Sequence, residues 1–281
     1  MSTPTSENVV DRPPRGAHLW LVLAAGLFAL PLVWMVLTSL KTPDQIKAEP
    51  YAWLPQPLAA GNYAESLSAM PLARYLGNTL LLCMGSVAGT LVSCTCAAYA
   101  FALLRWPGRD VWFGVLIATM LLPWQVTMAP RFEIIRAVGL YNTLGELIVP
   151  TLFGNAFYVF LLRQFFLTVP RETLDAARID GCGEAAVLWR IVLPVARPAL
   201  ATVALLQFVA AWNDYGGPLL YLSDPRKFPL AYGLEQFVSA HSSETHLMLA
   251  AAVVFTLPIL VLFFLTQRVF IRGIATTGLK G

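Results

Sequence analysis

The chain has 281 residues, of which 57% are hydrophobic and only 12% are charged. An ordinary soluble domain carries about 25% charged residues, so much of this chain must lie against something apolar, and lipid is the obvious candidate. The net charge of +3 comes from 19 basic and 16 acidic side chains scattered along the chain. This scatter forms no basic patch, so we expect no nucleic-acid partner, and charge informs membrane topology instead.

The cysteines and histidines form no metal-binding pattern. Cys83, Cys94 and Cys96 lie within one apolar run, Cys182 stands alone, and no CxxC pair occurs. The three histidines are far apart or poorly spaced, since the closest two differ by five positions rather than three or four. We therefore expect no metal site.

Six apolar runs approach or exceed the roughly 20 residues of helix that cross a bilayer. Four of them are free of charge over their whole length: 19–40, 78–104, 111–130 and 247–267. Two shorter runs, 147–162 and 198–213, reach spanning length if Arg163 extends to one interface and Asp214 lies near the other. The sequence thus predicts an all-α polytopic membrane protein with six transmembrane helices.

The first run is too long for the apolar region of a signal peptide, and Thr38-Ser39-Leu40-Lys41 offers no small-x-small cleavage site. An uncleaved span is therefore favoured. Four prolines lie within or at the edges of the runs, where they can kink helices: Pro31, Pro123, Pro150 and Pro258. In the second run, small residues recur every four positions, which predicts a face where another helix packs closely: Gly85, Gly89, Ser93 and Ala97.

Orientation follows from the basic residues near the span ends, which favour the cytoplasm. With the N-terminus inside, twelve basic residues face the cytoplasm: Arg12, Arg15, Arg105, Arg109, Arg163, Arg171, Arg178, Arg190, Arg197, Arg268, Arg272 and Lys280. Seven face outward: Lys41, Lys47, Arg74, Arg131, Arg136, Arg226 and Lys227. We expect both termini to be cytoplasmic, with an N-terminal segment 1–18, a membrane domain 19–270 and a tail 271–281.

The largest inner loop, residues 168–197, is predicted to contain two short helices and a hinge. Pro170 suits a first helical turn, and Gly181 can adopt the left-handed conformation that ends a helix. Asp175 is four positions from Arg171 and three from Arg178, so ion pairs can cover one side of the first helix.

In the second helix, Leu188, Ile191 and Val192 share a face, while Ala185 and Ala186 leave room for a partner to approach. Taken by itself, this periodicity favours an ordinary amphipathic connector that lies on the membrane.

The loop resembles the EAA loop of permease subunits in bacterial ABC importers. The positions that carry this resemblance are Asp175, Ala176, Ala177, Gly181, Ile191, Leu193 and Pro194. The resemblance implies that the loop docks in a cleft of a separate ATPase subunit, with Asp180 among the coupling residues. Asp175 departs from the pattern, which usually has Glu there. The carboxylate is kept, one methylene shorter, and we expect docking to survive.

Further stretches resemble the carbohydrate-type branch of these permeases. They are Ser39-Leu40-Lys41-Thr42, Asn78-Thr79-Leu80, Ala97-Ala98-Tyr99-Ala100-Phe101, Arg163-Gln164-Phe165-Phe166, Gln267-Arg268, Arg272-Gly273 and Lys280-Gly281. The resemblance implies a multi-pass protein of the bacterial inner membrane. It also implies a second permease subunit in a heterodimer, two copies of an ABC ATPase subunit, and an extracytoplasmic solute-binding protein that lands on the outer loops.

No GxxxxGK[ST] phosphate loop occurs in the chain, so ATP hydrolysis requires another polypeptide. We expect no cofactor on this chain, with ATP and Mg²⁺ bound by the partner ATPase. No Ser/His/Asp or Cys/His constellation is visible either, which favours a transport subunit over an enzyme.

Polar groups within spans are the candidates for the path of the solute, because polar atoms that face lipid are costly. They lie in the fourth and fifth runs and just after: Asn155, Tyr158, Gln207, Trp212, Asn213, Asp214 and Tyr215. Amides and carboxylates can hydrogen-bond sugar hydroxyls, and aromatic faces can cover a sugar ring. Each of these residues could instead tie helices together or cap a helix end.

The alternative function is an ion-driven secondary transporter, which would be expected to show buried ionisable residues and an internal repeat of the fold. An intramembrane enzyme is a weaker alternative. The cargo is predicted to be a sugar, and glycerol phosphate or another polyol-like solute remains open.

Overall fold

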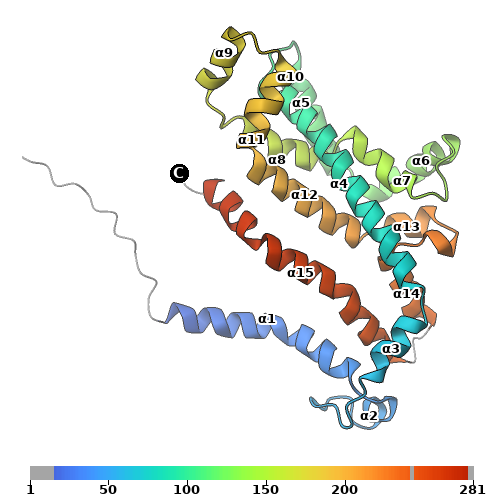
Figure 1. Ribbon diagram of the computed structural model, residues 1–281. Helices are drawn as coiled ribbons and strands as arrows, with labels where there is room; N and C mark the ends of the chain where they lie inside the picture. The colour runs from blue at the N-terminus through green and yellow to red at the C-terminus, as the bar shows by residue number, and fades with distance from the viewer. Residues whose placement is uncertain (1–15, 241–243, 278–281) are drawn as a thin grey trace, which may run out of the picture.

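The computed structural model describes residues 16–240 and 244–277, and its regular elements are all helices. Three helices are long and apolar enough to cross a membrane, and up to six spans result if each of three bent helix pairs counts as one. Figure 1 shows the other long helices lying to one side of α4, Leu72–Ala102. The expected all-α membrane fold is confirmed.

The first and last spans lie on the same side of this assembly, with the last span between the first span and the rest. α1, Ala17–Ser39, and α15, Thr245–Thr277, each contain one proline, and they come together near α3, Gly61–Ser68 (Figure 1). Most of α1 is exposed, with apolar side chains such as Trp20 and Phe28 turned outward. The predicted tail 271–281 is helical as far as Thr277, and most of the predicted segment 1–18 lies outside the described residues.

The third run, expected over 111–130 with Pro123 as a residue that can kink it, is divided into two helices. α5, Arg109–Ala118, continues into the short helix η1, Thr119–Leu121, and α6, Trp124–Ala137, then starts at an angle of 102° to it. Pro123 has no N–H to donate and forces the preceding residue out of the helical region, and Leu122 accordingly has a ψ of 116°. The apolar composition predicted a span, and the proline divides it.

The fourth span is bent by 40° between two helical pieces. α7, Gly145–Ile148, and η2, Val149–Phe153, lead to Gly154, whose φ is +85°, and α8, Ala156–Phe166, follows. Asn155 begins α8, because its side-chain oxygen accepts hydrogen bonds from the N–H groups of residues 157 and 158. The first N–H groups of α8 therefore remain hydrogen-bonded at the bend.

The fifth span is α12, Arg197–Trp212, which packs on α4. It follows the inner loop, whose helices are α9, Arg171–Ile179, α10, Glu184–Val187, the π-helix η3, Leu188–Val192, and α11, Leu193–Val195. Between α12 and α15 lie α13, Gly216–Tyr221, η4, Pro225–Lys227, and α14, Leu230–Ala240. The remaining helix α2, Pro43–Ala48, follows α1.

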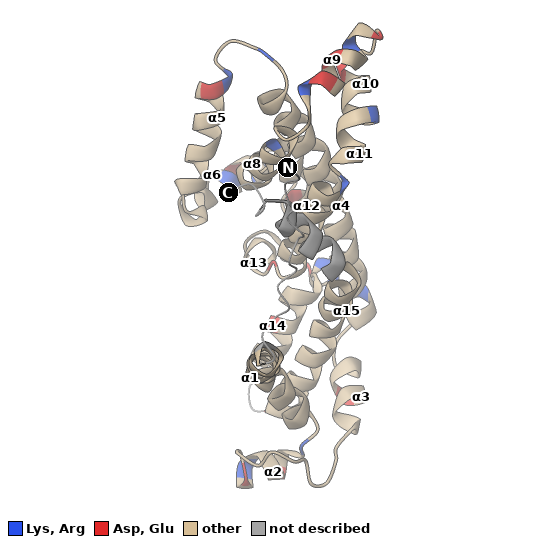
Figure 2. Ribbon diagram, turned by 90° about the vertical axis from the view of Figure 1, so that its left-hand side faces the viewer, with Lys and Arg blue, Asp and Glu red and all other residues tan. Residues whose placement is uncertain are grey.

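Figure 2 shows the charged residues gathered at the ends of long helices that are otherwise nearly free of charge.

The small-residue face of α4 packs on the fourth span, as predicted. A Cβ atom placed on Gly85 would lie 2.8 Å from Cδ1 of Ile148, and one on Gly89 would overlap the hydroxyl of Thr151. Ser93 continues this face, since its hydroxyl donates a hydrogen bond of 2.7 Å to the Thr151 carbonyl. The glycines therefore set how closely α4 approaches η2.

We expect Gly89→Val to destabilise the folded protein by about 1–3 kcal/mol, because the new side chain must push η2 away from α4. Gly77→Val is the matched control, since Gly77 lies on the same helix with nothing within 4 Å of its Cβ position. Thermal unfolding of both variants in one detergent tests this, and equal midpoints would contradict the close packing.

Candidate coupling loop and pocket

The first helix of the loop, α9, is built as its sequence predicts. It begins after Pro170 and ends at Asp180, and Gly181 then adopts a φ of +82°, a conformation in which glycine is favoured. Ala177 is buried in the core, whereas Asp175 and Ala176 are exposed. The loop thus turns one side of α9 to the protein and leaves the other free.

A network of polar side chains joins α9 to α10 and to α4. Arg178 donates hydrogen bonds to Asp175 Oδ1 at 3.1 Å and to Glu184 Oε1 at 3.0 Å. Tyr99, from α4, donates its hydroxyl hydrogen to Glu184 Oε2. We call these four residues the Arg178 network. Of the two ion pairs expected for Asp175, the structure forms the one with Arg178, and no ion pair of Arg171 occurs among the described residues.

The charges of this network reinforce one another. Hydrogen bonds from Arg178 and from Tyr99 lower the pKa of Glu184, with Arg178 the larger cause, and the carboxylate in turn raises the pKa of Arg178. Because the folded-state pKa of Glu184 is depressed, the network stabilises the loop above the usual pKa of a glutamate. That stabilisation is lost as the pH falls through the lowered value.

The second half of the loop is anchored by its apolar face. Leu188 and Val192 are buried, and Ile191 and Leu193 pack against the same core. The turn over Leu188–Val192 widens into a π-helix just before Pro194. Proline lacks an N–H and crowds the carbonyl four residues earlier, and a widened turn relieves this. Pro194 itself is exposed.

Two large apolar side chains of the loop are exposed. Ile179 is 86% exposed and Trp189 is 68% exposed. Exposed apolar side chains of this size, rimmed by charged residues, are typical of a surface that another protein covers.

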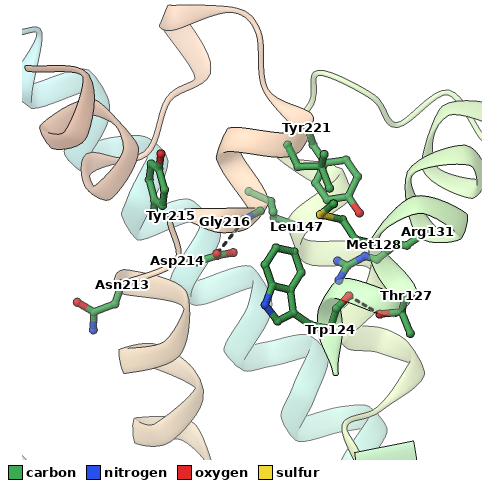
Figure 3. Close-up of a pocket in the computed structure, with 12 residues that line it drawn as sticks. Trp124, Thr127, Met128, Arg131, Leu147, Asn213, Asp214, Tyr215, Gly216 and Tyr221 are labelled. Carbon is green, nitrogen blue, oxygen red and sulfur yellow. Dashed lines mark hydrogen bonds between the residues drawn. The ribbon is translucent and has the colours of Figure 1, made fainter. Parts of the chain in front are cut away.

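A pocket of about 490 Å³ lies where two helices break off, at the α5–α6 break and after α12. Its walls are Trp124, Thr127, Met128, Arg131, Leu147, Asn213, Asp214, Tyr215, Gly216, Gly217, Leu220 and Tyr221, and we call it the Asp214 pocket. Figure 3 shows the indole of Trp124 between the Arg131 guanidinium and the Asp214 carboxylate. Asp214 Oδ1 accepts a hydrogen bond of 3.1 Å from the Gly217 N–H, which fixes the carboxylate at the break.

Comparison with known proteins places this architecture in a family. The family model described as "Binding-protein-dependent transport system inner membrane component" matches residues 89–276, which include the inner loop and the Asp214 pocket. The chain belongs to this family. It is a permease subunit of the ABC importers and a multi-pass membrane protein.

Relatives that match nearly the whole length of this chain are also permease proteins of transport systems. The permease is 32% identical to the sulfoquinovosyl glycerol transport system permease protein SmoH of Agrobacterium fabrum, over 96% of this chain and 94% of that protein. It is 30% identical to the arabinooligosaccharides transport system permease protein AraQ of Halalkalibacterium halodurans, over 92% and 93%. The sn-glycerol-3-phosphate transport system permease protein UgpE of Agrobacterium fabrum is also 30% identical, over 93% and 95%.

Solved structures show the same fold. A chain of a bacterial ABC transporter involved in the import of the acidic polysaccharide alginate superposes with a TM-score of 0.75 at 25% identity, over 91% of the permease and 98% of that chain. A second alginate transporter structure, in complex with an alginate pentasaccharide-bound periplasmic protein, gives a TM-score of 0.65 at 13% identity.

The predicted path residues of the permease separate into two groups. Asn213, Asp214 and Tyr215 line the Asp214 pocket together. The other four lie outside its walls. Trp212 is buried in a stack with Phe208, and Gln207 is half-buried on α12.

The two residues of the fourth span have structural surroundings of their own. Asn155 caps α8, and Tyr158 is buried in the core beside Cys94. The contacts of Asn155 are therefore those of a helix cap, the other role considered for it from the sequence.

Several residues of the pocket and the loop were not predicted as site residues. Trp124, Arg131 and Tyr221 line the pocket from elements far away in the chain. Glu146 is fully buried, with neither carboxylate oxygen hydrogen-bonded among the described residues. The position of Glu146 directly before the apolar run 147–162 is a sequence signal that an acidic side chain lies at the start of a span. The hydrogen bond of Tyr99 could not be predicted from the sequence, since its partner Glu184 is 85 residues away.

We expect Glu184→Gln to loosen the loop of the permease, because it removes the charge that Arg178 and Tyr99 bind. A partly exposed ion pair contributes up to about 1 kcal/mol, so amide hydrogen exchange in α9 should accelerate about twofold to fivefold. Glu172→Gln is the control, since Glu172 lies on α9 without an ion pair in the described structure. Unchanged exchange in Glu184→Gln would show that the network does not hold α9.

Proposed function

We propose that this permease forms part of the translocation path for a sugar or sugar-like solute, and that a separate ATPase subunit drives it through the inner loop. The observation that carries the proposal is the Asp214 pocket, which lies between the α5–α6 break and the chain just after the end of α12. Irregular backbone in a membrane domain is tolerated where it is buried in protein or lines a water-filled cavity.

The chemistry of the pocket suits a polyhydroxylated solute. Its volume lies within the roughly 300–1,000 Å³ of small-molecule sites. Trp124, Tyr215 and Tyr221 offer aromatic faces, while Asp214 and Thr127 offer hydrogen-bonding groups. The solutes in the names of the relatives support this class, because sulfoquinovosyl glycerol, arabinooligosaccharides and alginate are all rich in hydroxyl groups.

A charged solute is also compatible with the pocket. Arg131 extends its guanidinium into the pocket (Figure 3) and forms no ion pair in the described structure. Guanidinium groups bind sulfonate, phosphate and carboxylate well. A sugar-like solute with an acidic group, such as glycerol phosphate, therefore remains within the proposed class.

We expect Asp214→Asn to raise the KM for transport about tenfold or more, because a hydrogen bond to a charged group contributes roughly 1.5–3 kcal/mol. The variant keeps an oxygen that can accept from the Gly217 N–H, so the break should remain intact. Asp224→Asn is the control, since Asp224 bonds Arg226 outside the pocket. Uptake of the solute of the cognate binding protein into proteoliposomes is the measurement, and equal KM values for both variants would oppose the proposed path.

The inner loop is proposed to dock on the ATPase. Ala176 and the apolar side chains of Ile179 and Trp189 are exposed and offer a partner surface. Asp175 is proposed to take part as well, since its carboxylate is bound by Arg178 but stays exposed. In this assembly the permease pairs with a second permease as a heterodimer. Two ATPase copies bind ATP and Mg²⁺, and an extracytoplasmic binding protein delivers the solute. The loop and both termini then face the cytoplasm.

We expect Gly181→Val to abolish solute-stimulated transport while membrane insertion is kept, because valine cannot adopt a φ of +82° without strain and the hinge must move. Gly183→Val is a matched control two residues away. Gly183 has a φ of −70°, and neither glycine has an atom within 4 Å of its Cβ position. Transport and co-purification of the ATPase are measured together. Full transport by Gly181→Val would contradict the role of the hinge.

Uptake under ATP depletion, with the ion gradient held, separates this function from an ion-driven secondary carrier. We expect uptake to stop. Uptake that persists without ATP would favour the carrier, although the family to which the chain belongs lends that alternative no support.

A further inference from the structure

A second hollow of the permease lies beside the inner loop, between the α4–α5 turn and α9. Its volume is about 640 Å³, and its walls are Ala102, Leu103, Leu104, Arg105, Trp106, Arg109, Arg171, Leu174, Asp175, Arg178 and Glu184. We call it the arginine recess. The first turn of α5 and the helix α9 bring charged residues to the same end of the molecule, as Figure 2 shows.

The charges around the recess do not cancel in pairs. Asp175 and Glu184 are both bound by Arg178, and Asp110, at the start of α5, is bound by Arg109 at 3.1 Å. Arg105 and Arg171 have no acidic partner among the described residues, and both are exposed at the rim. Two guanidinium groups from different elements thus remain available for one anion.

An apolar groove adjoins this recess and shares Trp106 with it. The groove has a volume of about 510 Å³ and is lined by Phe101, Trp106, Trp112, Val115, Leu116 and Thr119. Trp112 is 59% exposed and Val115 is 50% exposed, so this face of α5 is uncovered within the chain. The indole N–H of Trp106 donates to the Ala100 carbonyl at 3.1 Å, which fixes the ring where recess and groove meet.

We propose that the arginine recess and the groove together bind one anionic phospholipid of the phosphatidylglycerol type. The phosphate binds between Arg105 and Arg171, and an acyl chain lies along Trp112 and Val115. Basic recesses between helices at the membrane surface suit acidic lipid headgroups, and tryptophan favours the boundary between headgroup and acyl chain. A soluble anion would use the recess but would have no use for the groove.

The bound lipid gives the inner loop a second attachment. The Arg178 network ties α9 to α4 from within the protein. A phosphate held by Arg171 of α9 and Arg105 of the α4–α5 turn ties the same helix to the membrane. The site does not depend on which solute the permease carries, so its failure and the failure of the proposed function are distinguishable.

The test is native mass spectrometry of the purified transporter, supplied with phosphatidylglycerol or with phosphatidylcholine. A basic side chain near an anionic lipid contributes about fivefold in affinity, so Arg105→Gln/Arg171→Gln should bind phosphatidylglycerol roughly twenty-five-fold more weakly than the unaltered protein. Arg190→Gln is the matched control, because Arg190 is an exposed arginine of the same loop outside the recess. It should bind the lipid as the unaltered protein does.

Val115→Ser tests the acyl-chain half of the site with the arginines intact, and it should also weaken phosphatidylglycerol binding. The proposal is overturned if phosphatidylcholine binds equally well, or if the double variant and Arg190→Gln lose the lipid to the same extent. It is likewise overturned if inorganic phosphate displaces the lipid as well as free phosphatidylglycerol does, which would make the recess a plain anion site. Loss of ATPase co-purification in the double variant, with lipid binding unchanged, would assign the arginines to the ATPase instead.

Discussion

Every backbone N–H and C=O group inside a bilayer must find a partner within the protein, and this constraint decides where the permease chain can leave the helical conformation. The chain does so at few places, and each is compensated. Pro123 has no N–H to satisfy, Asn155 caps the helix that follows Gly154, and Asp214 binds the N–H of Gly217. Two of these three breaks meet at the Asp214 pocket, which makes broken helices and a polar cavity parts of one arrangement.

The same logic links the loop to the spans. The proposed docking of this loop on an ATPase requires a loop that is attached firmly on one side and free on the other. The attachment consists of buried Leu188 and Val192 together with the Arg178 network, whose last member, Tyr99, belongs to the central helix α4. The free side carries Ile179 and Trp189. A displacement of α9 by a partner would therefore reach α4 through hydrogen bonds to charged groups, which hold their geometry better than apolar contacts do.

Much of the fold was accessible from the sequence because lipid imposes simple rules on composition. The long apolar runs predicted α1, α4 and α15, and the recurrence of Gly85 and Gly89 predicted where another helix packs on α4. For the third span, the sequence predicted that Pro123 can kink a helix, and the structure shows two separate helices there. Apolar composition does not reveal that Pro123 divides a run into helices at 102°, because a proline kink and a complete break have the same local sequence.

The sequence by itself determined that this is a helical membrane protein, and it predicted a loop of short helices that turns at Gly181 between the fourth and fifth spans. Span length, charge and the conformational freedom of Gly181 are local properties. The tertiary structure alone decided which polar groups meet. Arg131 joins Asp214 in one pocket, Tyr99 reaches Glu184, and Arg105 faces the same recess as Arg171. These pairs are tens of residues apart in the chain, and only the packing of the helices brings them together.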